Sequence, residues 1–80
     1  MASRVWFITG CATGFGALLA QRLLDRGDTV AATDKDVTAL AHLHAGDAAR
    51  LLTLQLDVRD DDQIAAAVQA TLARYQKIDV

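Results

Sequence analysis

Three glycines follow a short apolar stretch near the start of the chain, and together they leave few folds open. Residues 5–16 read VWFITGCATGFG, which gives Gly10, Gly14 and Gly16 the spacing G-x-x-x-G-x-G. The apolar residues favour a buried β-strand, and a helix-forming segment comes directly after the glycines. A strand, a glycine turn and a helix N-terminus in this order can bind phosphate with backbone N–H groups alone.

The rest of the sequence predicts strands and helices in alternation. We expect strands at 5–9, 28–33 and 51–56, helices at 15–26, from 36 to about 44 and from 60 onward, and the start of a fourth strand at 77–80. Gly27 closes the first helix, and residues 45–47 form a loop. Such alternation is typical of the α/β class, here a Rossmann-type parallel sheet with helices on both faces and the strand order 3-2-1-4.

The third helix carries the clearest local signals. Asp60 and Gln63 have the spacing of a capping box, in which the first side chain caps the helix and the second reaches back. Four larger side chains then recur at intervals of 4, 4 and 3 residues: Ile64, Val68, Leu72 and Tyr75. This spacing predicts one buried face made of these four side chains.

Composition excludes several classes of protein. The chain has 80 residues, of which 52% are hydrophobic and 22% charged, and its net charge of −2 gives no basic surface for nucleic acid. Cys11 is the only cysteine, which excludes an internal disulfide and a cysteine pair for metal. No apolar run approaches the roughly 18 residues of a membrane span. We therefore expect a cytoplasmic protein with no metal, nucleic-acid or membrane partner.

Each glycine of the turn has a separate expected role. Gly10 permits the tight turn out of the strand, Gly14 lets the backbone approach a pyrophosphate, and Gly16 lets the helix pack closely on the sheet. The Thr13 hydroxyl is placed to donate to a phosphate oxygen. The alternative is an ordinary β–α turn that happens to contain glycine, which the surrounding strand and helix pattern disfavours.

Asp34 ends the second strand, 20 residues after Gly14. A carboxylate there can accept hydrogen bonds from both ribose hydroxyls of NAD, and it would repel the additional phosphate of NADP. Lys35 follows directly, and its cation could instead bind that phosphate. We expect NAD as the cofactor, with NADP as the alternative. A purely structural reading is that Asp34 caps the next helix.

Asp57 and Val58 follow the third strand, at the carboxyl edge of the sheet where ligands bind. Asp57 could accept a hydrogen bond from the amino group of adenine, while the Val58 backbone N–H contacts a ring nitrogen. The alternative is an aspartate that only forms the turn.

Other residues are weaker candidates. Cys11 could be a reactive thiol near a helix start, but a small space-filling role is more common for such a cysteine. His42 and His44 lie two residues apart on an expected helix and therefore point to different faces, which disfavours a shared metal. Core packing is the expected role of Tyr75.

These residues resemble the short-chain dehydrogenase/reductase family. Residues 9–16 (TGCATGFG) match its T-G-x-x-x-G-x-G motif in full, Leu56-Asp57-Val58 is similar to its adenine-binding D-V element, and residues 77–80 (KIDV) resemble the lead-in to its fourth strand. Residues 8–20 are also similar to the retinol and hydroxysteroid dehydrogenase-like members. The resemblance implies hydride transfer between NAD(P) and an alcohol/ketone pair. It implies cofactor contacts at Gly10, Thr13, Gly14, Phe15, Gly16, Asp34, Lys35, Asp57 and Val58.

The same resemblance implies that no catalytic residue lies in this chain. The family uses a Ser and a Tyr-x-x-x-Lys pair that come later in its members, whereas the only serine here is Ser3 and Tyr75 has no lysine four residues on. Residues 1–80 are therefore expected to be an incomplete NAD(P)-binding domain, truncated at the fourth strand, of an enzyme that could form homo-oligomers. The alternative is a non-catalytic dinucleotide-binding module that senses redox state.

Overall fold

A three-stranded parallel sheet forms the centre of the molecule. The computed structural model describes residues 4–80, so Ser3 lies outside it. In chain order the elements are β1 (Val5–Ile8), α1 (Gly14–Asp25), β2 (Thr29–Asp34), η1 (Val37–His42), η2 (Ala48–Arg50), β3 (Leu51–Gln55) and α2 (Asp61–Tyr75), where η denotes a 3₁₀ helix. The strand order is β1-β2-β3, with Val5 opposite Thr29 and Val30 opposite Leu51.

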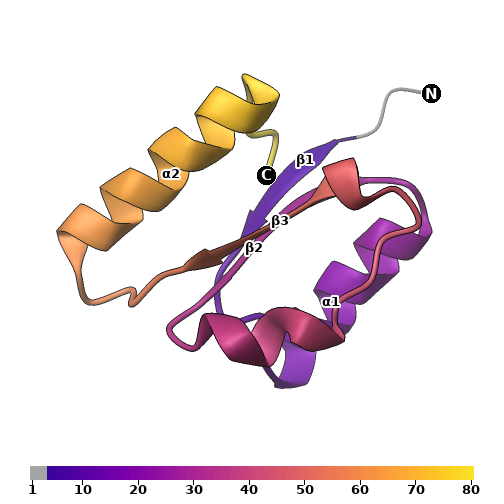
Figure 1. Cartoon of the computed structure of the whole chain (residues 1–80), viewed down its shortest axis with the longest axis horizontal. Helices are drawn as coiled ribbons and strands as arrows, with labels where there is room; N and C mark the ends of the chain where they lie inside the picture. The colour runs from indigo at the N-terminus through magenta and orange to yellow at the C-terminus, as the bar shows by residue number, and fades with distance from the viewer. Residues whose placement is uncertain (1–3) are drawn as a thin grey trace.

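Helices cover both faces of the sheet, as predicted for the α/β class. Figure 1 shows α1 and η1 together on one side of the strands and α2 on the other. The main core lies on the α1 side. Its buried members are Cys11, Ala20, Leu23, Leu24, Val30, Ala32, Leu40 and Leu43. Because β2 is the central strand and is covered on both faces, Val30, Ala31 and Ala32 are completely buried.

The boundaries of most elements agree with the prediction within a residue or two. The segment after β2 differs, because it forms the 3₁₀ helix Val37–His42 in place of the expected α-helix from 36 to about 44. Asp36 caps this helix through a bond from the Thr38 N–H. Gly27 has φ +99° directly after the end of α1, which is the backbone conformation expected for a closing glycine.

The buried face predicted for α2 is only partly correct. Ala67 and Thr71 are its buried residues, whereas Ile64, Val68 and Tyr75 are half-buried and Leu72 is exposed. The physical reason is that the helix lies against the sheet along its small residues, so the larger side chains flank the contact. The Thr71 hydroxyl is satisfied within the helix because it donates to the Ala67 carbonyl at 2.8 Å.

The end of the chain lies along the edge of β1 that β2 leaves free. Residues 77–80 are not assigned as a strand, but the Val80 N–H donates to the Val5 carbonyl at 3.2 Å and the Val80 carbonyl accepts from the Phe7 N–H at 2.8 Å. This is the pattern of a single parallel bridge. Figure 1 shows the C-terminus beside β1. The position agrees with the predicted order 3-2-1-4.

A buried carboxylate joins the beginnings of β1 and β2. Asp28 is 6% exposed and accepts hydrogen bonds from the Arg4 N–H at 3.2 Å and the Trp6 indole at 3.1 Å. Arg26 adds an ion pair at 2.8 Å. Burial alone would raise the pKa of Asp28, but these hydrogen bonds and the charge of Arg26 outweigh it and hold the pKa below its usual value.

We predict that Asp28→Ala destabilises the protein by about 1–3 kcal/mol, because it leaves the indole N–H of Trp6 without its partner. The lowered pKa of Asp28 means that its contribution is present at neutral pH and is lost as the pH falls below about 4. Urea unfolding at pH 7 and pH 3 measures both effects. Asp25→Ala, which changes an exposed carboxylate at the end of α1, should alter stability by less than about 0.5 kcal/mol. Equal losses in the two variants would contradict this account.

Candidate functional site

The turn between β1 and α1 depends on backbone conformations that favour glycine. Gly10 has φ +69° and Gly14 has φ +63°, and an ideal Cβ at either position would meet nothing within 4 Å. The requirement at these two positions is therefore conformational, and the space beside the backbone is open. This agrees with the expected roles of a tight turn at Gly10 and an accessible backbone at Gly14.

Gly16 is required for a different reason. A Cβ at this position would collide with the carbonyl oxygen of Gly10, and it would also lie 3.4 Å from the Cα of Cys11. The first turn of α1 therefore sits directly against the end of β1. The sequence predicted close packing at Gly16, and the structure locates that packing in the glycine turn itself.

The N-terminus of α1 is left without a side-chain cap. Thr13 occupies the N-cap position with extended backbone angles, but its hydroxyl makes no capping hydrogen bond, and the first turn contains no acidic residue. Phe15, in the same turn, is 76% exposed. The other three helical elements are each capped by an aspartate: Asp36, Asp47 and Asp60. The first N–H groups of α1 and the positive end of its dipole therefore remain available to an anion.

Asp34 connects the end of β2 to the glycine turn. Its Oδ2 accepts from the Ala12 N–H at 3.1 Å, and its Oδ1 accepts from the Asp36 N–H at 3.1 Å. The cap of the following helix is Asp36, so the reading of Asp34 as that cap is wrong. These two backbone bonds fix the carboxylate at the carboxyl edge of the sheet. Lys35 lies exposed beside it.

Asp57 is held by the arginine two residues further on. Its Oδ1 accepts from the Arg59 backbone N–H at 3.0 Å and from Nε at 3.1 Å, and its Oδ2 accepts from Nη2 at 2.8 Å. These hydrogen bonds and the positive charges of Arg59 and Lys35 hold the pKa of Asp57 far below its usual value. The carboxylate is therefore ionised at neutral pH.

Asp60 and Gln63 shape the turn that carries Asp57. The Asp60 side chain accepts from the N–H groups of Asp62 and Gln63, which confirms the predicted cap. The Gln63 side chain reaches further back than a capping box requires, and its Oε1 accepts from the Asp57 N–H at 2.8 Å. The cap of α2 thereby also fixes the backbone at the end of β3.

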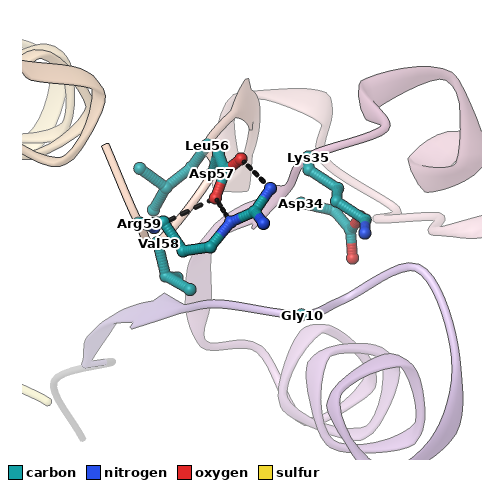
Figure 2. Close-up of a pocket in the computed structure, with 7 residues that line it drawn as sticks. All are labelled: Gly10, Asp34, Lys35, Leu56, Asp57, Val58 and Arg59. Atoms are coloured by element: carbon teal, nitrogen blue, oxygen red, sulfur yellow. Dashed lines mark hydrogen bonds and ion pairs between the residues drawn. The ribbon is translucent and has the colours of Figure 1, made fainter. Parts of the chain in front are cut away.

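The carboxyl ends of the three strands enclose a pocket of about 250 Å³ (Figure 2). It is lined by Gly10, Asp34, Lys35, Leu56, Asp57, Val58 and Arg59. Five of these belong to the predicted cofactor-binding set. The other predicted residues, Thr13, Gly14, Phe15 and Gly16, lie in the glycine turn that continues from Gly10 and do not line the pocket.

Sequence reasoning missed Leu56 and Arg59 as lining residues and Gln63 as a support. The signal for Gln63 was present in the capping-box spacing, although its partner was not predicted. Nothing in the spacing of Arg59 indicates that its side chain turns back toward Asp57. Leu56 was expected to end the third strand and to begin the adenine-binding element, but it was not among the predicted cofactor contacts.

The weaker candidates have structural roles. Cys11 is fully buried in the core, its thiol donates to the Ile8 carbonyl, and burial raises the pKa of the thiol, so the space-filling role fits. His42 donates from Nε2 to the Cys11 carbonyl at 3.1 Å. The backbone of His44 bonds to the side chain of Gln21. The Tyr75 hydroxyl donates to the Ala49 carbonyl.

Residues 4–80 offer neither a metal centre nor a membrane-spanning helix. No group of three or more His, Cys, Asp or Glu side chains is placed to hold a metal ion in this part of the chain. Within the same range, none of the helices has both the length and the apolar character that crossing a membrane requires.

Comparison with known proteins identifies the family. The family model described as short chain dehydrogenase matches residues 4–80. The chain therefore belongs to the short-chain dehydrogenase/reductase family. It is 41% identical over 83 residues to 2-(R)-hydroxypropyl-CoM dehydrogenase of Xanthobacter autotrophicus, an alignment that covers 98% of this chain and 33% of that protein. It is also 44% identical over 63 residues to 17-beta-hydroxysteroid dehydrogenase type 6 of Rattus norvegicus, covering 79% of this chain and 20% of the relative.

Solved structures show the same fold. The 3-ketoacyl-(acyl-carrier-protein) reductase of Brucella melitensis complexed with NADH matches with a TM-score of 0.85 at 31% identity, over 95% of this chain and 31% of that one. The predicted Rossmann-type class is thus confirmed. The chain spans a third or less of the length of these relatives.

We predict that Gly16→Ala destabilises the protein by about 1–3 kcal/mol, since the added methyl group displaces α1 from the Gly10 carbonyl. Thermal or urea unfolding measures the loss. Gly46→Ala is the matched control, because an ideal Cβ there has no neighbour within 4 Å and the residue lies in a loop. A Gly16→Ala variant as stable as Gly46→Ala would show that the close contact is not required.

Proposed function

We propose that this chain binds the adenosine and pyrophosphate portions of a nicotinamide dinucleotide in an NAD(P)-dependent oxidoreductase. The observation that carries the proposal is the uncapped N-terminus of α1, which lies next to the pocket at the carboxyl edge of the sheet. The family membership and the NADH complex of the Brucella reductase support it. When bound, the cofactor supplies hydride exchange with an alcohol or ketone substrate.

In this proposal the glycine turn binds the phosphates. The backbone N–H groups from Thr13 to Gly16 provide donors, since those of Cys11 and Ala12 already bond to Thr33 and Asp34. The positive end of α1 favours negative charge. The open space beside Gly14 gives a phosphate access to the backbone. Thr13 contributes its hydroxyl, which is free of a capping role. Phe15, largely exposed at the same helix end, contributes its backbone and contact surface.

The pocket binds the adenosine end. Asp57 accepts a hydrogen bond from the exocyclic amine of adenine, and the Val58 backbone N–H contacts a ring nitrogen. Val58 is 60% exposed, so it also offers apolar surface to the base. An ionised, fixed carboxylate suits this role because it accepts hydrogen bonds and cannot donate them.

Asp34 selects NAD over NADP. Each of its oxygens already accepts one backbone N–H and keeps a further acceptor position for a ribose hydroxyl. The carboxylate cannot easily move away from a 2′-phosphate, because the bonds from Ala12 and Asp36 hold it in place. Lys35 lines the same pocket and reduces this repulsion. The repulsion from Asp34 outweighs the attraction of Lys35 for the additional phosphate, so NAD binds more tightly than NADP.

The chemical step belongs to residues outside this chain. We propose that residues 1–80 are the incomplete NAD(P)-binding domain of a longer cytoplasmic enzyme, since the chain spans only 33% and 20% of the length of the two relatives named above. By family resemblance, a Ser and a Tyr-x-x-x-Lys pair supply the catalysis there. Homo-oligomers of that enzyme are compatible with the proposal. An assay for reduction of a ketone by NADH, made with the product of the complete open reading frame, tests this proposal. Tight binding of NADH without turnover would instead favour the non-catalytic module.

We predict that Gly14→Ala raises the Kd for NADH by about 10-fold or more, because the methyl group strains the turn and obstructs the phosphate-binding backbone. Fluorescence titration of NADH into the full-length protein measures the Kd.

Gly27→Ala is the strain-matched control for this variant. Gly27 also has a positive φ, of +99°, and open space around it, but it lies at the other end of α1. Both variants should lose stability through strain of about 1 kcal/mol. Only Gly14→Ala should lose affinity, so an equal Kd in the two variants would refute the phosphate-binding role.

We predict that Asp34→Ala shifts the NADH:NADPH affinity ratio toward NADPH by about 10-fold, since it removes both the ribose acceptor and the charge that repels the phosphate. Titration of the two cofactors into the same preparation gives the ratio directly. Asp36→Ala removes a nearby carboxylate that does not line the pocket, and it should leave the ratio unchanged. An unaltered ratio in Asp34→Ala would remove its assigned role.

A further inference from the structure

The Asp57–Arg59 pair forms one wall of the pocket. Three hydrogen bonds join the two residues, and Figure 2 shows the guanidinium of Arg59 turned back onto the carboxylate of Asp57. The Asp57 side chain is 29% exposed and that of Arg59 is 81% exposed. The pair is therefore in contact with whatever enters the pocket.

The turn itself does not depend on the Arg59 side chain. The Asp57 N–H donates to Gln63 Oε1 at 2.8 Å, and the Asp60 N–H donates to the Asp57 carbonyl at 2.9 Å. The Arg59 backbone N–H also binds Asp57 Oδ1 at 3.0 Å, a bond that any residue except proline would make. Truncation of Arg59 should therefore leave the backbone in place and remove only the two guanidinium hydrogen bonds to the carboxylate.

An exposed ion pair between neighbouring residues contributes little to folding stability, so stability does not account for the arrangement. Its clear effect is on the hydrogen-bonding capacity of Asp57. A carboxylate has about four acceptor positions, two on each oxygen. Oδ1 already accepts two bonds from Arg59, and Oδ2 accepts one. One acceptor position remains, on Oδ2, and its direction is set by the planar guanidinium.

We propose that Arg59 is a positioning residue that makes this pocket selective for a base with an exocyclic amine. It fixes the Asp57 carboxylate so that the remaining acceptor of Oδ2 meets one N–H of adenine and disfavours the carbonyl oxygen of hypoxanthine. Without the guanidinium, only the backbone N–H still holds Oδ1, so Oδ2 is no longer fixed and is hydrated, and much of this discrimination is lost. The inference rests on the proposed binding of a nicotinamide dinucleotide and adds a residue that acts through Asp57.

The test compares NADH with its hypoxanthine analogue, in which a carbonyl replaces the 6-amino group of the purine and N1 carries a hydrogen. Both Kd values are measured by nicotinamide fluorescence in the full-length protein. We expect the wild type to bind NADH roughly 10-fold more tightly than the analogue. In Arg59→Ala the Kd for NADH should rise while that for the analogue changes little, so that the ratio falls to about 3 or less. Arg59→Lys, which offers a single charged group without the planar fork, should give an intermediate ratio.

A double-mutant cycle with Asp57→Ala separates action through Asp57 from direct contact. Arg59→Ala should have no further effect on the ratio in the Asp57→Ala background, because the group that it positions is gone. A ratio that stays at the wild-type value in Arg59→Ala, or equal weakening of both ligands, would overturn the proposal. Failure of the wild type to bind either dinucleotide would instead refute the proposed function.

Discussion

The contact between Gly16 and the carbonyl oxygen of Gly10 determines where everything else at this sheet edge lies. No side chain fits between them, so the first turn of α1 begins directly above the end of β1. The positive φ values of Gly10 and Gly14 let the chain reverse within this short distance. The helix N-terminus is thereby brought to the edge at which β2 and β3 also end, and the turn that leads into it donates to the Asp34 carboxylate through the Ala12 N–H.

Hydrogen bonds then fix the charged groups around that N-terminus. Asp34 is held by two backbone N–H groups, one from the glycine turn and one from the residue that caps η1. Asp57 is held by Arg59, and its backbone is held by Gln63. The pocket thus contains two carboxylates and two cations. Its acceptors are already oriented, so a ligand loses less free energy to ordering them when it binds.

The sequence was sufficient for the parts of this arrangement that depend on local pattern. Glycine spacing, alternation and the Asp60 cap each reflect a short-range rule, and they predicted their elements correctly except after β2, where a 3₁₀ helix replaces the expected α-helix. Arg59 could not be predicted in this way, because a bond between residues two apart in a turn leaves no periodic signal. The prediction that Leu72 is buried was wrong for another reason. Its spacing fits a buried helical face, but α2 meets the sheet through Ala67 and Thr71. The spacing of the large side chains alone does not predict a contact made by small residues.

Two α-helices begin at the same edge of the sheet, and their caps differ in a way that the site requires. Asp60 accepts from two N–H groups at the start of α2, and acidic residues fill its first turn, so the positive end of that helix is neutralised from within. Thr13 leaves the start of α1 open, and no acid lies in its first turn. An aspartate at Thr13 would give α1 a better cap, worth about 1 kcal/mol. It would also place a negative charge where the proposed function puts a phosphate. The threonine therefore gives up some helix stability and keeps the only uncapped α-helix N-terminus of residues 4–80 beside the pocket.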